Sequence, residues 1–254
     1  MADGYVGEIF SSIQGEGLYV GVRQLFLRMA GCIWNCVYCD TRRFRDFRPA
    51  NCMVEIKPGS GRFRPVKNPL SAESVFEHLE GLWTEDVHSV SITGGEPLLS
   101  ANFIADVARI CGRNGLKTYL ETNGCSSDAM EIVLPHIDIA AIDIKLPDHR
   151  AVPETGWKRI FEEEMKCIDM AARRSVDVFA KVVVLASSSD RDLANVFSRL
   201  ARLNVPLVLQ PVTGTGRVKP PPFERLCRIS ETAVRAGIRE IAIIPQVHRL
   251  MGVR

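Results

Sequence analysis

The chain has 254 residues, of which 46% are hydrophobic and 24% are charged, a composition typical of one soluble globular domain with a substantial core. Its 32 Lys and Arg nearly balance its 30 Asp and Glu, for a formal net charge of +2, so charge gives no reason to expect a nucleic-acid or membrane-surface partner. The sequence has neither a basic, apolar leader nor a run of about 18 apolar residues that could span a bilayer, and we expect a cytoplasmic protein.

Two strand-like segments open the chain, at residues 6–10 and 24–29, both rich in apolar and β-branched side chains. They are joined by the glycine-rich sequence Ser-Ile-Gln-Gly-Glu-Gly at residues 12–17. Taken alone, this segment indicates only a flexible turn.

Three cysteines follow, Cys32, Cys36 and Cys39, in the spacing C-x3-C-x2-C. Thiolates are soft ligands that select zinc, copper(I) or iron-sulfur clusters. A structural zinc site takes four protein ligands, yet the nearest histidine, His78, is far along the chain. A 4Fe-4S cluster held by three cysteines would keep one iron open for a ligand that is not protein. The other five cysteines are scattered and indicate reduced thiols rather than a disulfide framework: Cys52, Cys111, Cys125, Cys167 and Cys227.

Residues 42–68 form a basic segment that is interrupted by prolines. Residues 52–56 and 62–66 flank the turn Gly59-Ser60-Gly61, so we expect an inserted hairpin-like excursion. Its arginines are interpreted as a solvated face in preference to a binding patch: Arg42, Arg43, Arg45 and Arg48.

From Ser71 onward, helical and strand patterns alternate. Helices are predicted from a cap at Ser71 and over residues 101–114, 157–172, 190–203 and 223–236, with a short one ending at 130–134. Strands are predicted at 88–93, 117–122, 137–144, 176–185, 206–211 and 240–245. Repeated βα units imply a parallel sheet with helices outside, but the pattern does not decide between an open sheet and a barrel.

The cysteine spacing, an aromatic residue before the last cysteine, and Thr-Gly-Gly-Glu-Pro at residues 93–97 together resemble the radical S-adenosylmethionine (SAM) superfamily. The resemblance implies an α/β fold, a partial (βα) barrel with its active site at the carboxyl ends of the strands. It also implies a 4Fe-4S cluster on the three cysteines, with SAM on the open iron. One electron, from a donor such as flavodoxin or ferredoxin, then yields a 5′-deoxyadenosyl radical that takes a hydrogen atom from the substrate.

The same resemblance assigns SAM-binding residues at successive strand ends. The glycines at 94 and 95 let the backbone approach SAM, and Tyr38 contacts the adenine. The implied SAM-binding set is Tyr38, Gly95, Glu96, Asp143, Ile144, Lys145, Gln210, Pro211, Val212 and Thr213. Without the resemblance, Asp143 and Lys145 could be an exposed ion pair of little energetic worth, and Lys181 is interpreted as structural.

Four further places resemble one family within that superfamily, the 7-carboxy-7-deazaguanine synthases: the loop at 12–17, Arg28, Cys-Asp-Thr at 39–41, and Pro-Gln-Val-His-Arg at 245–249. These enzymes convert 6-carboxy-5,6,7,8-tetrahydropterin into 7-carboxy-7-deazaguanine with loss of ammonia, on the route to queuosine- and archaeosine-type bases of tRNA. The family implies a homodimer and a Mg²⁺ ion held by Thr41, in keeping with the preference of Mg²⁺ for oxygen ligands.

The family also implies a substrate site, in which Glu16, Arg28 and His248 are the catalytic residues. Polar groups of the loop suit the lactam edge of a pterin, and a planar guanidinium suits its carboxylate. The implied substrate-binding residues are Ile13, Gln14, Gly15, Glu16, Arg28, Thr93, His248 and Arg254.

We therefore expect one radical SAM domain over residues 1–254, with the excursion at 42–68 and a substrate-closing tail at 246–254. The chain departs from many relatives in the length of the excursion, and from some in ending at Arg254 where they end in Pro. Two other functions fit the cysteine motif: a glycyl-radical enzyme activase, which acts on a partner protein, and a non-catalytic scaffold that carries a metal cluster.

Overall fold

A computed structural model describes residues 2–214 and 218–254 of the chain. The strands are β1 (Val6–Ile13), β2 (Arg23–Met29), β3 (Asn51–Glu55), β4 (Phe63–Lys67), β5 (Ser89–Gly94), β6 (Thr118–Thr122), β7 (Ile139–Ile144), β8 (Asp177–Val184), β9 (Leu207–Pro211) and β10 (Ile241–Ile243). The α-helices are α1 (Ala72–Glu80), α2 (Ala101–Arg113), α3 (Ser127–Val133), α4 (Trp157–Ala172), α5 (Asp190–Leu200), α6 (Phe223–Arg235) and α7 (Val247–Met251). Short 3₁₀ helices are η1 (Arg42–Arg45), η2 (Pro97–Ser100), η3 (Leu134–His136), η4 (Pro147–His149) and η5 (Glu154–Gly156).

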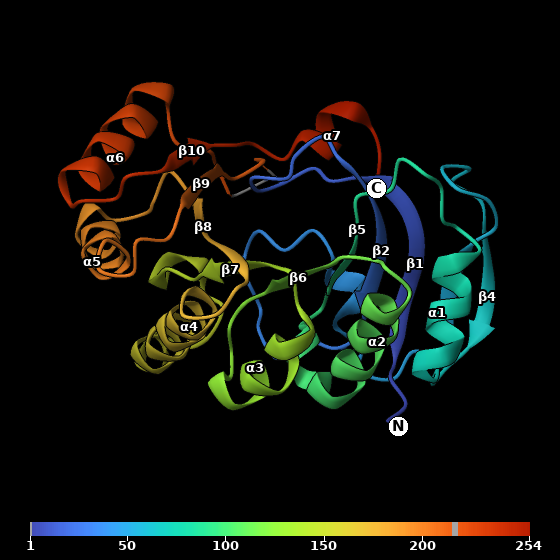
Figure 1. The fold of residues 1–254 in the computed structure, drawn as a ribbon. Helices are drawn as coiled ribbons and strands as arrows, with labels where there is room; N and C mark the ends of the chain where they lie inside the picture. Colours follow the sequence, from blue (N-terminus) through green and yellow to red (C-terminus); the bar gives the residue numbers. More distant parts are fainter. Residues whose placement is uncertain (1, 215–217) are drawn as a thin grey trace.

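The described strands form one sheet in the order β10-β9-β8-β7-β6-β5-β2-β1-β3-β4. From β2 to β10 every neighbouring pair is parallel, as expected for strands that are joined by crossover helices. The sheet curves, with helices α1 to α6 along its outside, and the two edge strands β4 and β10 lie at opposite ends (Figure 1). The predicted partial (βα) barrel is confirmed.

Side chains of the central strands alternate between two environments, because successive residues of a strand point to opposite faces. In β8, Val178, Ala180 and Val182 belong to the main core beneath the helices. Phe179 of the same strand packs on the inner face, in a small cluster with Tyr119, Ile139, Ala141 and Val208. Lys181 is the next residue along that inner face, so the alternation places a lysine above this apolar cluster.

The excursion is the predicted hairpin. Strands β3 and β4 pair antiparallel, and β3 pairs parallel with β1, so the hairpin extends the sheet at one edge. Helix α1 begins as predicted, because the Ser71 side chain accepts a hydrogen bond from the backbone N–H of Ser74.

The predicted elements from residue 71 onward are confirmed, with differences at their ends. Helix α5 stops at Leu200 and β10 covers only Ile241–Ile243, both shorter than predicted, whereas β1 continues to Ile13. The short helix α7 in the tail was not predicted. Among the described helices, none combines the length and apolar character needed to cross a membrane.

Candidate active site

A large pocket opens at the carboxyl ends of the parallel strands, beside the loop that follows β2. Most of the predicted site residues line it. They are Ile13, Gln14, Gly15, Glu16, Arg28, Cys32, Cys36, Tyr38, Cys39, Thr41, Thr93, Gly95, Glu96, Asp143, Lys145, Gln210, His248 and Arg254. Residues far apart in the sequence therefore meet in one cavity.

Four predicted SAM-binding residues lie outside this lining. The Ile144 side chain is buried in the main core, on the helix-covered face of β7. Val212 packs in a small cluster that includes Tyr38, one residue beyond the end of β9. Pro211 and Thr213 are half-buried. The side chains of these four residues do not line the pocket. Val212 is connected to it through its contact with Tyr38.

The cysteine loop supplies three thiols to one wall of the pocket. Cys32, Cys36 and Cys39 form no disulfide, and all three pack around Trp34 and Ala151. Burial raises the pKa of the Cys32 and Cys36 thiols, so a bound cation is needed to favour their thiolate forms. Three thiols on one wall of the pocket fit a 4Fe-4S cluster with one open iron.

The Gly-Gly-Glu-Pro loop after β5 lies directly against the cysteine loop. The Gly95 amide donates to the Met29 carbonyl at 3.0 Å, and the Glu96 amide donates to the Gly31 carbonyl at 2.8 Å. A Cβ atom at Gly95 would lie 1.9 Å from the Gly31 carbonyl oxygen. The glycine is therefore required by a close approach of two backbones.

This contact makes a prediction for Gly95→Ala. We expect the clash to displace one of the two loops, to lower the free energy of unfolding by about 1–3 kcal/mol, and to weaken SAM binding. Gly112→Ala is the matched control, since nothing lies within 4 Å of a Cβ placed there in α2, and a helical Gly to Ala change stabilises by roughly 0.5–1 kcal/mol. Thermal unfolding and SAM titration measure both effects. Equal behaviour of the two variants would contradict the argument.

The Glu96 side chain links two strand ends rather than projecting freely into the pocket. It accepts hydrogen bonds from the Thr122 hydroxyl at 2.6 Å and from the Asn123 amide at 2.8 Å. Burial raises the pKa of this carboxyl to about 7, against hydrogen bonds that favour its ionised form. Glu96 thus fixes the end of β6 relative to the loop after β5.

Unsatisfied acceptors mark the same region of the pocket. Among the described residues, Asn123 Oδ1 and Gln210 Oε1 are buried and accept no hydrogen bond, and both residues line the pocket. Buried polar atoms are rarely left unpaired. Two orphaned acceptors in the lining that also holds the three thiols therefore fit a ligand that brings N–H and O–H donors, as the amino and ribose groups of SAM would.

A network of buried charges forms the inner wall. Asp143 and Lys181 are register partners on β7 and β8, and Lys181 Nζ lies 3.2 Å from Asp143 and 2.5 Å from Glu16. Lys145 Nζ lies 2.8 Å from the other oxygen of Asp143. Burial alone would raise the pKa of Asp143, but the two lysines hold it at about 2. Lys181 likewise outweighs burial and lowers the pKa of Glu16.

The interpretation of Lys181 as merely structural is wrong in one respect, since this lysine lines the pocket and pairs with a predicted substrate residue. Glu121 was also missed as a site residue. Its carboxylate lies in the pocket and accepts from Gln14 at 3.0 Å. Burial raises the pKa of Glu121, with Glu16 adding to the effect and Lys181 opposing it.

The loop at 12–17 is held by Gln14. This side chain is buried, its amide nitrogen donates to Gln24 and Glu121, and its oxygen accepts from the Glu16 backbone. All of these partners are protein groups, so Gln14 shapes the loop and presents Glu16.

Arg28 lines the pocket from β2. Its Nε donates to Glu8 at 2.9 Å, and its guanidinium lies over the rings of Phe10 and Phe44. The solvated-face interpretation of the excursion arginines holds only in part. Arg45 lines the pocket, and Arg43 pairs with the buried Glu8 at 3.3 Å.

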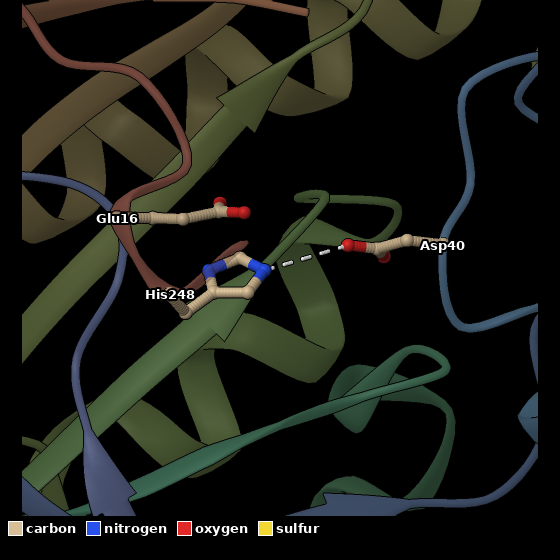
Figure 2. Close-up of side chains that lie close together, drawn as sticks. All are labelled: Glu16, Asp40 and His248. Carbon is tan, nitrogen blue, oxygen red and sulfur yellow. Dashed lines mark ion pairs between the residues drawn. The ribbon is translucent and has the colours of Figure 1, made fainter. Parts of the chain in front are cut away.

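The tail closes over the loop at 12–17. The Val247 amide donates to the Gly15 carbonyl at 2.8 Å, and Gln246 Nε2 donates to both Glu16 and Asp40. Figure 2 shows Glu16, Asp40 and His248 converging from three separate segments, with His248 Nε2 3.9 Å from Asp40. A Cβ at Gly15 would lie 2.3 Å from His248 Nδ1, so the loop needs a glycine there to receive the tail.

These three side chains have a spacing that could hold a metal ion. Their carboxylates already have partners, however: Lys181 and Gln246 for Glu16, and Gln246 and Arg249 for Asp40. The contacts therefore indicate that this cluster joins the tail to the pocket rim.

Comparisons with known proteins agree with the sequence motifs and with the residues that line the pocket. Residues 26–200 match the Radical SAM superfamily. The 7-carboxy-7-deazaguanine synthase of Methanocaldococcus jannaschii is 34% identical over 97% of this chain and 99% of that protein. The synthase of Geobacter sulfurreducens is 37% identical over 96% of each.

Among solved structures, QueE from Escherichia coli has a TM-score of 0.58 at 18% identity and covers 97% of this chain and 95% of its own. SuiB from Streptococcus suis, bound to S-adenosylmethionine, has a TM-score of 0.54 at 15% identity, over 84% of this chain and 48% of its own. These two likenesses support the fold alone. With the motif match and the full-length relatives, the chain belongs to the radical SAM superfamily and, within it, to the 7-carboxy-7-deazaguanine synthases.

Proposed function

We propose that this protein converts 6-carboxy-5,6,7,8-tetrahydropterin into 7-carboxy-7-deazaguanine with loss of ammonia, using a 4Fe-4S cluster, SAM and Mg²⁺. The observation that carries the proposal is the single pocket in which three thiols, a set of orphaned acceptors, and the Glu16, Arg28 and His248 side chains meet. A full-length relationship to synthases favours this activity over a glycyl-radical activase and over a non-catalytic scaffold.

Two ends of the pocket have separate tasks in this proposal. Cys32, Cys36 and Cys39 would hold the cluster, and the strand ends that carry Asn123 and Gln210 would bind SAM. When bound, the cluster and SAM supply the one-electron chemistry that removes a hydrogen atom from the substrate. The loop at 12–17 and the tail, which contact each other, would bind and enclose the pterin.

The charges of the chain orient that substrate. Glu16 stays ionised at neutral pH because Lys181 lowers its pKa, so its carboxylate can accept hydrogen bonds from the amino and lactam N–H groups of a pterin. Arg28 offers a planar guanidinium to the substrate carboxylate. His248 lies beside Asp40 and Gly15, where a closed tail would keep water from the reacting ring.

Mg²⁺ is proposed at Thr41, which lines the pocket next to Asp40. The only side-chain contact of the Thr41 hydroxyl among the described residues is to Cys39 Sγ at 3.7 Å. A hydroxyl together with substrate oxygens and waters suits a hard cation that gives up its water reluctantly. An electron donor such as flavodoxin or ferredoxin, a homodimeric assembly and a cytoplasmic location complete the proposal.

Thr41→Ala tests the magnesium site. We expect cluster absorbance and SAM affinity to be retained, while turnover falls by roughly a hundredfold because the metal's stabilisation of developing charge is lost. Thr232→Ala, on the exposed face of α6, is the control. A Thr41→Ala enzyme with an unchanged response to Mg²⁺ would place the metal elsewhere.

His248→Ala tests the tail. We expect the KM for the pterin to rise about tenfold through a lost hydrogen bond in a closed site, while SAM cleavage without product formation remains measurable. Leu250→Ala alters a side chain on the same helix that is 80% exposed and is expected to behave like wild type. If both variants keep wild-type kinetics, the tail does not close the pocket.

The function itself is tested by anaerobic reconstitution followed by incubation with SAM, dithionite, Mg²⁺ and the carboxytetrahydropterin. The synthase reading requires 7-carboxy-7-deazaguanine, methionine and 5′-deoxyadenosine among the products. An activase would cleave SAM but leave the pterin unchanged, and a scaffold would release no methionine. Either of these results would overturn the proposal.

A further inference from the structure

Glu8 is a buried carboxylate that receives three guanidinium groups. Arg28 Nε lies 2.9 Å, Arg43 3.3 Å and Arg254 2.6 Å from its oxygens. The three arginines come from β2, from η1 in the excursion, and from the last residue of the sequence. One side-chain carboxylate meets three guanidinium groups, and no other side-chain ion pair is found for these arginines within residues 2–214 and 218–254. The side chains of the cluster therefore carry an excess of positive charge.

Arg254 is fixed in this cluster by two further contacts. Its guanidinium lies over the Phe63 ring at 4.1 Å from the centroid, and its carbonyl oxygen accepts a hydrogen bond from the Ser12 hydroxyl at 2.8 Å. Phe63 belongs to β4, so the inserted hairpin provides the surface on which the Arg254 side chain rests. The end of the chain accordingly lies beside β1 in Figure 1.

Two members of the cluster also line the pocket, namely Arg28 and Arg254, and Arg45 lines it nearby. Glu8 lies behind them, outside the pocket lining. A guanidinium has five N–H groups, and within the described part of the chain Arg254 donates only to Glu8. An excess of positive charge with donors to spare, held rigidly at a pocket wall, is suited to an anionic group of the ligand.

We propose that Arg254 joins Arg28 in binding the carboxylate of the substrate, and that Glu8 and the hairpin residue Phe63 hold it in position. The inference rests on the proposed function for the identity of the ligand. It also assigns a task to the 42–68 excursion: this segment supplies the support for a specificity-determining arginine that arrives from the other end of the chain.

The test measures binding without turnover, using enzyme reconstituted with its cluster and supplied with SAM but no reductant. Two probes are compared, 6-carboxy-5,6,7,8-tetrahydropterin and 6-methyl-5,6,7,8-tetrahydropterin, which lacks the carboxylate. Arg254→Ala is expected to weaken binding of the carboxylated probe about tenfold, as for loss of a charge-assisted hydrogen bond, and to leave the methyl probe unaffected. Phe63→Leu, which keeps an apolar side chain but removes the π face, is expected to weaken only the carboxylated probe, by about threefold.

Arg235→Ala is the matched control, because this arginine is exposed on α6 and pairs only with Glu231 among the described residues. It removes the same charge and should change neither affinity. Unchanged binding of the carboxylated probe in Arg254→Ala, or equal weakening of both probes, would overturn the inference. Because binding is measured directly, a wild-type enzyme that binds the carboxylated probe yet forms no product would contradict the proposed function while the comparison of probes still decides the role of Arg254.

Discussion

Replacing Cys32, Cys36 or Cys39 by Ala is expected to abolish the visible absorbance of the reconstituted cluster and all SAM cleavage. The three thiols line one wall of the pocket, and no cysteine outside this motif lines it. Removing one of them therefore leaves only two thiolates for the cluster, and the pocket offers no other cysteine to replace the lost ligand. Anaerobic reconstitution, iron and sulfide analysis, and methionine release measure the loss.

Cys125→Ala is the most demanding control for this prediction. Cys125 packs against the same group of side chains as the three motif cysteines, but it is absent from the pocket lining. Cys52→Ala and Cys167→Ala, in the main core, test for indirect loss through destabilisation. Complete loss of the cluster in Cys125→Ala, with an unchanged thermal unfolding midpoint, would mean that a ligand has been misplaced.

The sequence was sufficient to predict the order of strands and helices, because local periodicity carries that information. The β8 strand shows the limit. Its apolar run predicts a buried strand, but the partner of Lys181 depends on the register that places it opposite Asp143. A lysine within an otherwise apolar strand was the available signal for a buried ion pair, and it was interpreted as structural.

Contacts between the two ends of the chain could not be predicted either, because local sequence patterns carry no information about which distant residues meet. Glu8 lies between Gly7 and Ile9 in β1. Nothing near it in the sequence indicates that it pairs with Arg254, which is 246 residues away. Helix α7 has a similar origin. It spans only Val247–Met251, too short to be stable by propensity alone, and its first residue is held by the Gly15 carbonyl.

Lys181→Met is expected to reduce kcat/KM by roughly a hundredfold, because it removes the cation that holds the Glu16 carboxylate in place. Breaking a buried ion pair from one side also lowers the free energy of unfolding, by about 3–5 kcal/mol. Lys181 pairs with both Glu16, which we propose binds substrate, and Asp143, which we propose lies at the SAM end of the pocket. Without Lys181, the one side-chain hydrogen bond left to the Glu16 carboxylate among the described residues is that from Gln246, and the buried Glu121 lies nearby. We regard Lys181 as a positioning residue that acts through Glu16.

The pH dependence gives the sharper readout. In the wild-type enzyme Lys181 lowers the pKa of Glu16, against burial, which raises it, so Glu16 stays ionised down to acidic pH. Removing the cation leaves burial and the nearby Asp143 to raise that pKa. Glu16 would then take up a proton at a higher pH than in the wild-type enzyme, and the acid limb of kcat/KM should move to higher pH. Lys181→Arg keeps the charge and should restore the wild-type limb in part.

Two further variants separate positioning from a general loss of structure. Lys166→Met removes a lysine that is 59% exposed and pairs with Glu163 on α4, and it should leave the profile unchanged. In a Glu16→Gln background the carboxyl that Lys181 acts on is absent, so adding Lys181→Met should have much less effect than it has alone. If the two substitutions instead multiply their separate losses, Lys181 does not work through Glu16. The remaining explanation would then be its ion pair with Asp143, whose pKa of about 2 in the folded protein depends on both lysines.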